Sequence, residues 1–250
     1  NGETYYNANL KLVEYTMTEV MAQNLNLTEG TVASISTAQE LKNLATYTNS
    51  GKNTKGVTFK LTSDITLNEN VLNQDGTLNE TNASSFVQWE PIGTPIYIID
   101  PNDDTKYIKV DNPIRFEGVF DGQGNSIKGI YINKGIVWNH ALFANNYGVV
   151  KNVDVIDGYI HAEGQYIASV VGYCKGNVKN CTSGVTIVQG DVWAHCGSIV
   201  GSLSSGIIES CVNLGNISGY SPSGITGSIY GGMVINCVNL GDISGKYPAG

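Results

Sequence analysis

The 250-residue sequence contains few charged residues, and hardly any of them is arginine. Asp, Glu, Lys and Arg make up 14 % of the chain, where soluble proteins usually have about 25 %. Arg115 is the only arginine, and 14 basic residues against 22 acidic ones give a formal net charge of −8. Lys and Arg supply most contacts to phosphate groups, so this balance predicts neither a nucleic-acid partner nor an anionic membrane surface.

Long hydrophobic runs and metal-binding motifs are also absent from the sequence. No apolar run reaches the roughly 18 residues that a membrane span needs, so we expect no membrane insertion. The five cysteines are odd in number and include no CxxC, which predicts neither a zinc site nor an obvious disulfide framework. The histidines His140, His161 and His195 share no HxxxH or HExxH spacing. We therefore expect no metal and no cofactor.

An internal repeat dominates the second half of the chain. Five segments read alike, each with β-branched residues followed by Gly, Asn or Ser and an apolar residue: 126–130, 149–153, 177–181, 207–211 and 233–237. A second column consists of Ile160, Ile187, Ile217 and Ile243. A third column consists of four boxes, 141–144, 169–172, 198–201 and 228–231. Three columns that keep their phase across variable spacing predict three walls joined by loops of variable length.

The residues in these columns favour strands over helices. They are short, β-branched and interrupted by Gly and Asn, and no 3.6-residue stripe persists. We therefore predict an all-β, right-handed parallel β-helix, with turns stacked about 4.8 Å apart. Gly129, Asn152, Asn180, Ser210 and Asn236 should form a left-handed corner, since Gly and Asn tolerate that backbone conformation.

The residues that follow this corner should form one interior ladder: Ile130, Val153, Cys181, Cys211 and Cys237. The ladder cysteines are then small buried apolar side chains with inert thiols. Disulfides between neighbouring turns are the alternative, but in-register strands rarely provide the required torsion angle. The pairing of Cys174 and Cys196, which lie outside the ladder, stays undetermined.

The first half of the chain predicts a cap and an insertion. Residues 34–48 read as an amphipathic capping helix, with Ser36 or Thr37 as N-cap and Glu40 or Gln39 completing a capping box. The β-helix should span 57–250, with a long polar loop insertion at 68–112. Residues 1–33 have no clear pattern, and within them 10–21 could be helix or strand. Because the last turn has no polar cap, we expect a larger multidomain chain, or a neighbour that covers this turn.

Several segments resemble the GLUG-motif repeat family. These are 35–41, 61–65, 89–93 and 116–127, the last containing the FDGxGxxI run, and the resemblance covers roughly residues 35–245. Ala or Ser stands in place of the first glycine of the Gly-Leu-x-Gly box. The family comprises bacterial cell-surface β-helix modules, which also occur in streptococcal immunoglobulin-A metallopeptidases. The resemblance implies an extracellular, cell-surface location and a scaffold or adhesive role without shared chemistry.

The acidic residues raise the alternative of a carbohydrate-active enzyme, either a polysaccharide lyase or a glycoside hydrolase. A glycosidase needs two carboxylates about 5 to 10 Å apart. Asp121 lies in a Gly-rich turn, where Asp commonly accepts a hydrogen bond from the backbone two residues on. Asp100, Asp103 and Asp104 could bind calcium, although a solvated acidic turn explains them better. Arg115 is the only guanidinium available for an anionic sugar. No catalytic constellation emerges, so we predict a non-catalytic protein.

Aromatic residues provide the strongest functional signal. Trp138, Tyr166 and His195 each precede the last residue of their box by six positions, and Trp193 lies two residues before His195. In phase, they would form a ridge across successive turns that Tyr220 could extend. Such a ridge can stack on sugars or contact a protein; the alternative is local core packing under the loops.

We therefore predict Trp138, Tyr166, Trp193 and His195 as ligand-binding residues. The predicted function is an adhesin-like surface module that binds a glycan or a host or cell-surface protein, or a scaffold within a larger surface protein. A purely architectural stalk is a further possibility.

Overall fold

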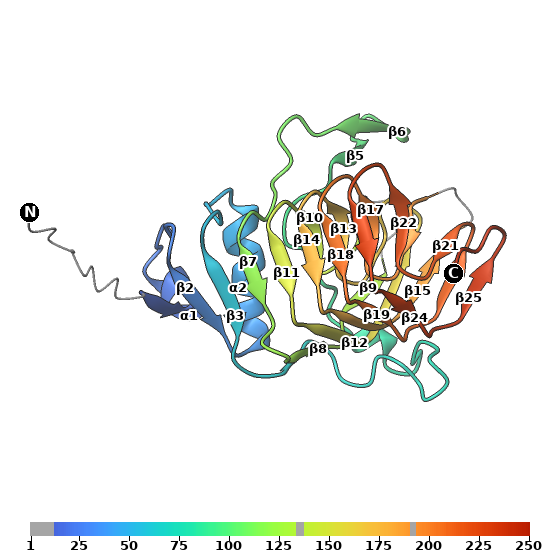
Figure 1. Ribbon diagram of the computed structural model, residues 1–250, viewed down its shortest axis with the longest axis horizontal. Coiled ribbons are helices and arrows are strands. Elements are labelled where there is room, and N and C mark those ends of the chain that lie inside the picture. The colour runs from blue at the N-terminus through green and yellow to red at the C-terminus, as the bar shows by residue number, and fades with distance from the viewer. Residues whose placement is uncertain (1–12, 134–137, 191–193) are drawn as a thin grey trace, which may run out of the picture.

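The computed structural model describes residues 13–133, 138–190 and 194–250, which fold into a parallel β-solenoid of about seven turns (Figure 1). The predicted parallel β-helix is confirmed. Successive turns contribute short strands to three walls, and within each wall neighbouring strands pair in parallel. The backbone groups are thus satisfied between turns.

The first wall has eight strands in the order β1-β2-β3-β7-β11-β14-β18-β23. Their bounds are Glu14–Thr16, Val32–Ile35, Thr58–Leu61, Val119–Asp121, Val149–Lys151, Asn177–Lys179, Ile207–Glu209 and Met233–Ile235. The corner after the last four strands has the predicted left-handed backbone, with φ of 55° at Asn152, 51° at Asn180, 54° at Ser210 and 52° at Asn236. Short side chains at these positions let the chain turn towards the second wall.

The first of the five repeat segments was placed in the wrong wall. Residues 126–130 begin with β8 (Ser126–Lys128), which pairs with the start of β12 (Asp154–Ala162) in the second wall. The strand that aligns with β11 is β7, so Gly129 and Ile130 lie outside the corner and the ladder. The four-residue turn Gly122–Asn125 separates β7 from β8, whereas two residues suffice in the next turn. Because this turn is longer, the repeat pattern alone does not show that β7, and not β8, aligns with β11.

The second wall contains the isoleucine column as predicted. Ile160 pairs with Ile187, Ile187 with Ile217, and Ile217 with Ile243. The strands of the wall are β4 (Ile65–Thr66), β8, β9 (Tyr131–Asn133), β12, β15 (Thr182–Gln189), β19 (Val212–Asn213), β20 (Ile217–Gly219), β24 (Val238–Asn239) and β25 (Ile243–Gly245).

The third wall confirms three of the four predicted boxes and corrects the last. Its strands are β10 (Phe143–Asn146), β13 (Val171–Cys174), β17 (Val200–Leu203) and β22 (Thr226–Ile229). Val200 pairs with Thr226, so the fourth box is 224–227 instead of 228–231. Two neighbouring stretches fit the pattern, and the loop that precedes the box is shorter in the last turn. The short strands β16 (Cys196–Gly197) and β21 (Pro222–Ser223) precede this wall.

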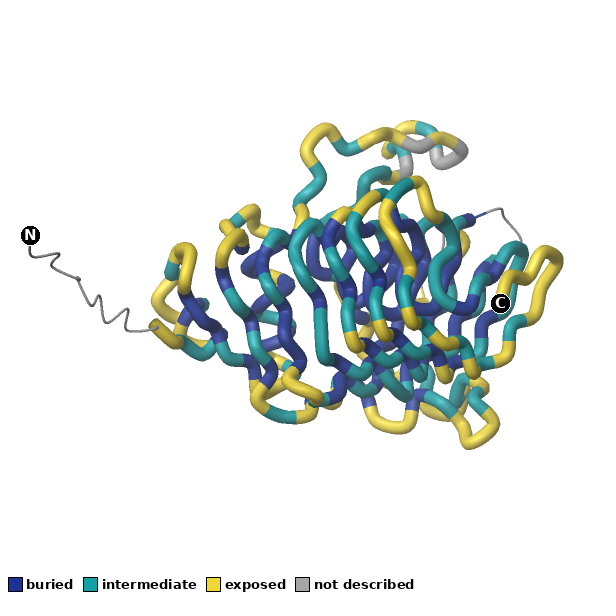
Figure 2. The backbone as a smooth tube through the Cα atoms, viewed as in Figure 1, coloured by how far each residue is buried: buried dark blue, intermediate teal, exposed yellow. Residues whose placement is uncertain are grey.

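The interior of the solenoid is its most buried part (Figure 2), and it contains four of the five predicted ladder residues. Val153, Cys181 and Cys211 are buried, and Cys237 is half-buried in the last turn. All five cysteines are free thiols. Outside the ladder, burial raises the pKa of Cys174 to about 11 and that of Cys196 to about 12. The thiols of Cys174 and Cys196 therefore act as small apolar core groups.

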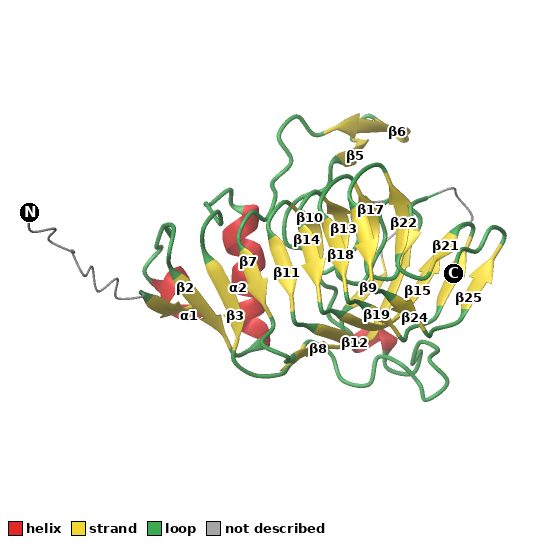
Figure 3. Cartoon of the chain, in the orientation of Figure 1, coloured by secondary structure: helices red, strands yellow, loops and turns green. Residues whose placement is uncertain are grey.

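Two helices fill the N-terminal end of the solenoid behind the first wall (Figure 3). Residues 14–22 form both elements that were considered, namely β1 and then α1 (Met17–Ala22). Helix α2 (Ala38–Asn49) has Thr37 as its N-cap and buries Leu41 and Leu44. The Glu40 side chain accepts hydrogen bonds from Ser36 and Thr18, which fixes α2 against α1. No helix in the described residues is long and apolar enough to cross a membrane.

The polar region 68–112 contains one short helical turn, η1 (Ala83–Ser85), and an antiparallel hairpin, β5 (Tyr97–Asp100) with β6 (Asp103–Lys109). The hairpin projects from the solenoid (Figure 1). Part of this region nevertheless belongs to the stack. Trp89 and Ile92 are buried, and their backbone N–H groups donate to Tyr131 and Leu142. The insertion is therefore two excursions on either side of a short wall segment.

Candidate functional site

Five aromatic rings from the hairpin and successive turns contact one another, and we call them the aromatic row: Tyr97, Trp138, Tyr166, His195 and Tyr230. Successive ring centroids lie 4.3, 5.4, 5.5 and 5.8 Å apart. The Tyr166 and His195 rings are nearly parallel, with 9° between their planes. The Tyr230 hydroxyl lies 3.1 Å from His195 Nε2.

The glycines that end the third-wall boxes position the backbone of the row. A Cβ on Gly201 would lie 2.6 Å from the Tyr166 carbonyl carbon, and a Cβ on Gly227 would lie 2.6 Å from that of His195. Only glycine leaves room for such close backbone approach. Tyr166 itself has a φ of 61°, which is uncommon for a bulky residue and is held by its surroundings. This packing explains why each ring residue lies six positions before the last residue of its box in the sequence.

Burial keeps the row electrically neutral at neutral pH. Burial raises the pKa of Tyr166 to about 12, and the nearby Tyr230, Tyr173 and Tyr97 add to this effect. Burial also lowers the pKa of His195 below its usual 6.5. The hydroxyl of Tyr166 stays protonated and the imidazole of His195 stays uncharged. The row therefore offers apolar ring surface with neutral polar tips, which suits a sugar or a protein surface.

The structure brings together three of the predicted site residues. Trp138, Tyr166 and His195 are half-buried and in contact, while Trp193 lies outside the described residues. Their role in ligand binding stays a prediction. Tyr220 does not extend the ridge as proposed, because its ring packs on Tyr247 at 5.3 Å.

Tyr230 takes the place that was expected for Tyr220, and 69 % of its surface is exposed. Its position was obscured by the misplaced fourth box, which had assigned this residue to the wall. Tyr97 was also missed, because it comes from the irregular insertion, where no repeat phase applies.

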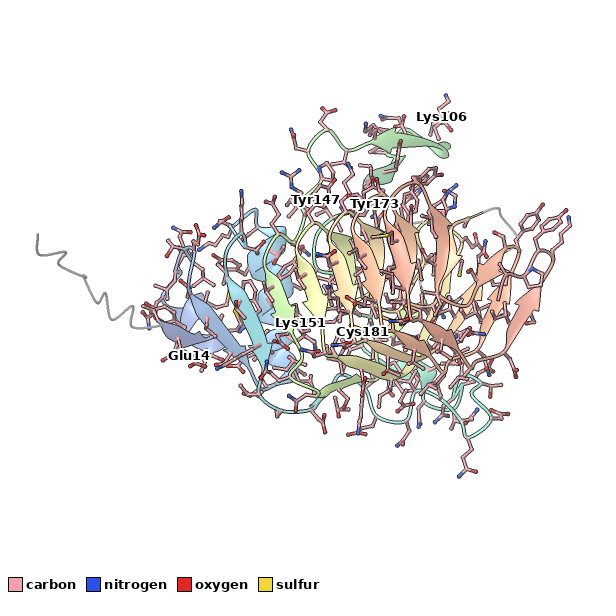
Figure 4. The ribbon with its side chains drawn as sticks, viewed as in Figure 1. Glu14, Lys106, Tyr147, Lys151, Tyr173 and Cys181 are labelled. Carbon is pink, nitrogen blue, oxygen red and sulfur yellow. The ribbon has the colours of Figure 1, made fainter. Side chains whose placement is uncertain are left out.

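A second group of aromatic residues continues from the row into a groove. Tyr173 lies 5.5 Å from Tyr166, ring to ring, and borders an open groove of about 620 Å³ under the stem of the hairpin. We call this the basic groove; its lining includes Tyr147, Tyr173, Lys52, Lys109, Arg115, Lys175, Asp111 and Glu117. Tyr147 and Tyr173 lie on the side of the solenoid from which the hairpin projects (Figure 4).

Asp121 has the structural role that its turn predicts. Its Oδ1 accepts hydrogen bonds from the Gln123 N–H and from Asn152 Nδ2, each at 3.0 Å, and its Oδ2 lies 2.9 Å from Lys151 Nζ. Burial opposes ionisation, but the hydrogen bonds and the lysine outweigh it, so the pKa of Asp121 is lowered. Both carboxylate oxygens are engaged in these contacts at the corner, so Asp121 is not available for catalysis.

The other acidic candidates are also turn residues. Asp100 Oδ1 accepts a hydrogen bond from the Asn102 N–H, and Asp103 pairs with Lys106, both near the tip of the hairpin. The side chain of Asp104 lies outside the described part of the structure. Among the described residues, no group of three or more His, Cys, Asp or Glu side chains is placed to hold a metal.

Another groove, of about 990 Å³, lies between the loop 73–81 and the second wall. It contains three carboxylates: Asp75, Glu80 and Asp242. Hydrogen bonds from Thr77 lower the pKa of Asp75, which is therefore ionised at neutral pH. This excludes Asp75 as a general acid, since that role needs a raised pKa.

Comparison with known proteins bears on the fold. No protein-family model matches the sequence, and no curated protein matches it either. Among solved structures, the chain is similar to the crystal structure of a "putative immunoglobulin A1 protease" from Bacteroides ovatus, with a TM-score of 0.53. The two proteins share a fold. Their sequences are 14 % identical over 90 % of this chain and 86 % of the other. Membership of the GLUG family stays a prediction.

Proposed function

We propose that this chain is a non-catalytic, extracellular module of a larger bacterial surface protein, and that it binds a glycan along the aromatic row. The observation that carries the proposal is the row itself, in which neutral rings from successive turns form one continuous surface. Aromatic surface flanked by hydroxyl groups suits carbohydrate.

The most exposed ring gives the sharpest test. Tyr230→Ala removes the exposed end of the row, and we expect it to weaken glycan binding at least tenfold without lowering Tm by more than about 2 °C, because a surface side chain contributes little to stability. Tyr247→Ala is the matched control: Tyr247 is 59 % exposed and lies outside the row. A glycan array with both variants reads out the difference. Equal binding by the two variants would refute the assignment.

Surface location and membership of a larger protein are part of the same proposal. They are supported by the resemblance to GLUG modules. The last turn exposes apolar side chains whose counterparts in the preceding turn are buried: Ile229 is 54 % exposed and Val234 36 %, whereas Leu203 and Ile208 are fully buried. We propose that a further turn or domain covers this face in the parent protein. Amides of β23 and β24 should then exchange with deuterium more slowly in the parent protein than in the isolated chain.

A carbohydrate-active enzyme is the second candidate, and the groove beside the loop 73–81 favours it because carboxylates gather there. The test is release of reducing sugar from a panel of acidic and neutral polysaccharides, with Asp242→Asn as the variant. Activity that this variant abolishes would replace the binding proposal with a hydrolytic one. Binding without any product release supports the first proposal.

A further inference from the structure

The basic groove concentrates positive charge on an acidic chain. The protein has a net charge of −8, yet four of its 14 basic residues line this one groove: Lys52, Lys109, Arg115 and Lys175. Only two carboxylates, Asp111 and Glu117, line it with them. The groove lining thus has a net positive charge while the whole molecule has a net negative charge, which favours an anionic ligand in this groove.

The cations are arranged around two tyrosine rings. The Arg115 guanidinium carbon lies 4.8 Å from the centre of the Tyr147 ring, and Lys175 Nζ lies 5.5 Å from the same centre. Lys175 also lies 5.9 Å from the Tyr173 ring. A ligand ring placed here would meet aromatic surface and two cations at once. This is the combination that recognises a sugar carrying an acidic group.

Two of these cations are available to a ligand. Lys52 is held by hydrogen bonds to Asn24 and to the Leu25 carbonyl, so it serves the N-terminal turn. Arg115 pairs through Nε with Glu117 at 3.3 Å, but its guanidinium carries five N–H donors in a rigid fork. Among the described side chains, no carboxylate pairs with Lys175. Arg115 and Lys175 are therefore the cations beside the tyrosine rings that can meet an anion.

The groove and the aromatic row form one surface, joined where Tyr173 meets Tyr166. We infer that the basic groove binds an anionic sugar, with its carboxylate or sulfate between Arg115 and Lys175 and its ring against Tyr147 and Tyr173. This inference rests on the proposed glycan-binding function. It adds that the ligand is an acidic glycan and that the acidic sugar lies at the hairpin end of the surface.

The test uses the full chain on an array of neutral, uronate-containing, sialylated and sulfated glycans. The variants are Arg115→Gln, Lys175→Gln and, as a control with the same charge change, Lys179→Gln on the first wall. We expect acidic glycans to bind, each groove variant to weaken binding about tenfold or more, and the control to leave it unchanged. Raising NaCl from 50 to 500 mM should weaken binding of the acidic glycans, because the charges are partly exposed. The sulfated and carboxylated arms identify which anion is bound.

Two results would overturn the inference. If the hits are neutral glycans whose binding depends on Tyr230 and not on Arg115 or Lys175, the proposed function stands and the anionic groove does not. If no glycan binds the chain at all, the proposed function fails and the inference fails with it.

Discussion

Replacing Asp121 with alanine should destabilise the protein without changing any binding. The carboxylate of Asp121 is only 7 % exposed and accepts two hydrogen bonds, from Gln123 and Asn152. Each such bond to a charged group contributes about 1.5 kcal/mol at the lower end of measured values. The ion pair with Lys151, whose side chain is 36 % exposed, contributes about 0.5 kcal/mol because water screens it. The expected loss is about 3.5 kcal/mol.

For a domain of this size, that loss corresponds to a fall in Tm of roughly 7 to 14 °C. Thermal and urea unfolding of the variant, followed by circular dichroism, measure it. Asp121→Asn separates the contributions, because the amide oxygen still accepts from the Gln123 N–H while the charge is gone. We expect this variant to lose about 1 kcal/mol at neutral pH.

The pH dependence of these two proteins follows from the lowered pKa of Asp121. The folded pKa lies below the unfolded value of about 3.9, so the stabilisation is fully present above that pH and disappears as the pH falls through the folded pKa. The wild type and Asp121→Asn should therefore differ at pH 7; the difference should begin to shrink only below about pH 4 and disappear once the pH has fallen below the folded pKa. Asp121→Ala with an unchanged Tm but weakened glycan binding would contradict the structural role.

Two further predictions concern the packing of the turns and the thiols. Gly201→Ala should lower Tm by several degrees and reduce the near-UV signal of Tyr166, since its Cβ would lie 2.6 Å from backbone; Gly184→Ala, whose Cβ would lie 3.1 Å from the Ile156 side chain, should cost less. A smaller effect at Gly201 than at Gly184 would show that the row is not held by the box glycines. With a thiol reagent under native conditions, Cys237 should react first and Cys196 only on unfolding, because Cys196 is fully buried. Rapid modification of Cys196 in the folded protein would contradict this.

The repeat made the fold predictable because each turn solves the same packing problem. The isoleucine column and the left-handed corners at Asn152, Asn180 and Ser210 follow from residue type and spacing alone. The repeat pattern does not predict the strand register where the loop length changes between turns. At 126–130 and 228–231 a neighbouring stretch has the same pattern, and only the pairing between strands decides which stretch belongs to the wall.

The site was predictable only in part, for a related reason. Trp138, Tyr166 and His195 share a fixed offset from the third wall, and the structure places their rings in contact. Tyr97 comes from the insertion and Arg115 from the segment that follows it, and neither has a counterpart in other turns. Residues that an irregular insertion brings together do not recur at the repeat spacing, so a single sequence does not reveal that they lie near the same groove.

Most interior wall strands pair with the equivalent strands of the turns before and after them, so the surface could change by whole turns. A turn touches mainly the turns before and after it, so duplicating or deleting one turn leaves the remaining contacts in place. Such an event would lengthen or shorten the line of rings by one unit while the hairpin end stayed the same. Under the proposed glycan-binding function, variation in copy number would therefore adjust the length of oligosaccharide that the aromatic row accommodates, independently of which terminal sugar the basic groove selects.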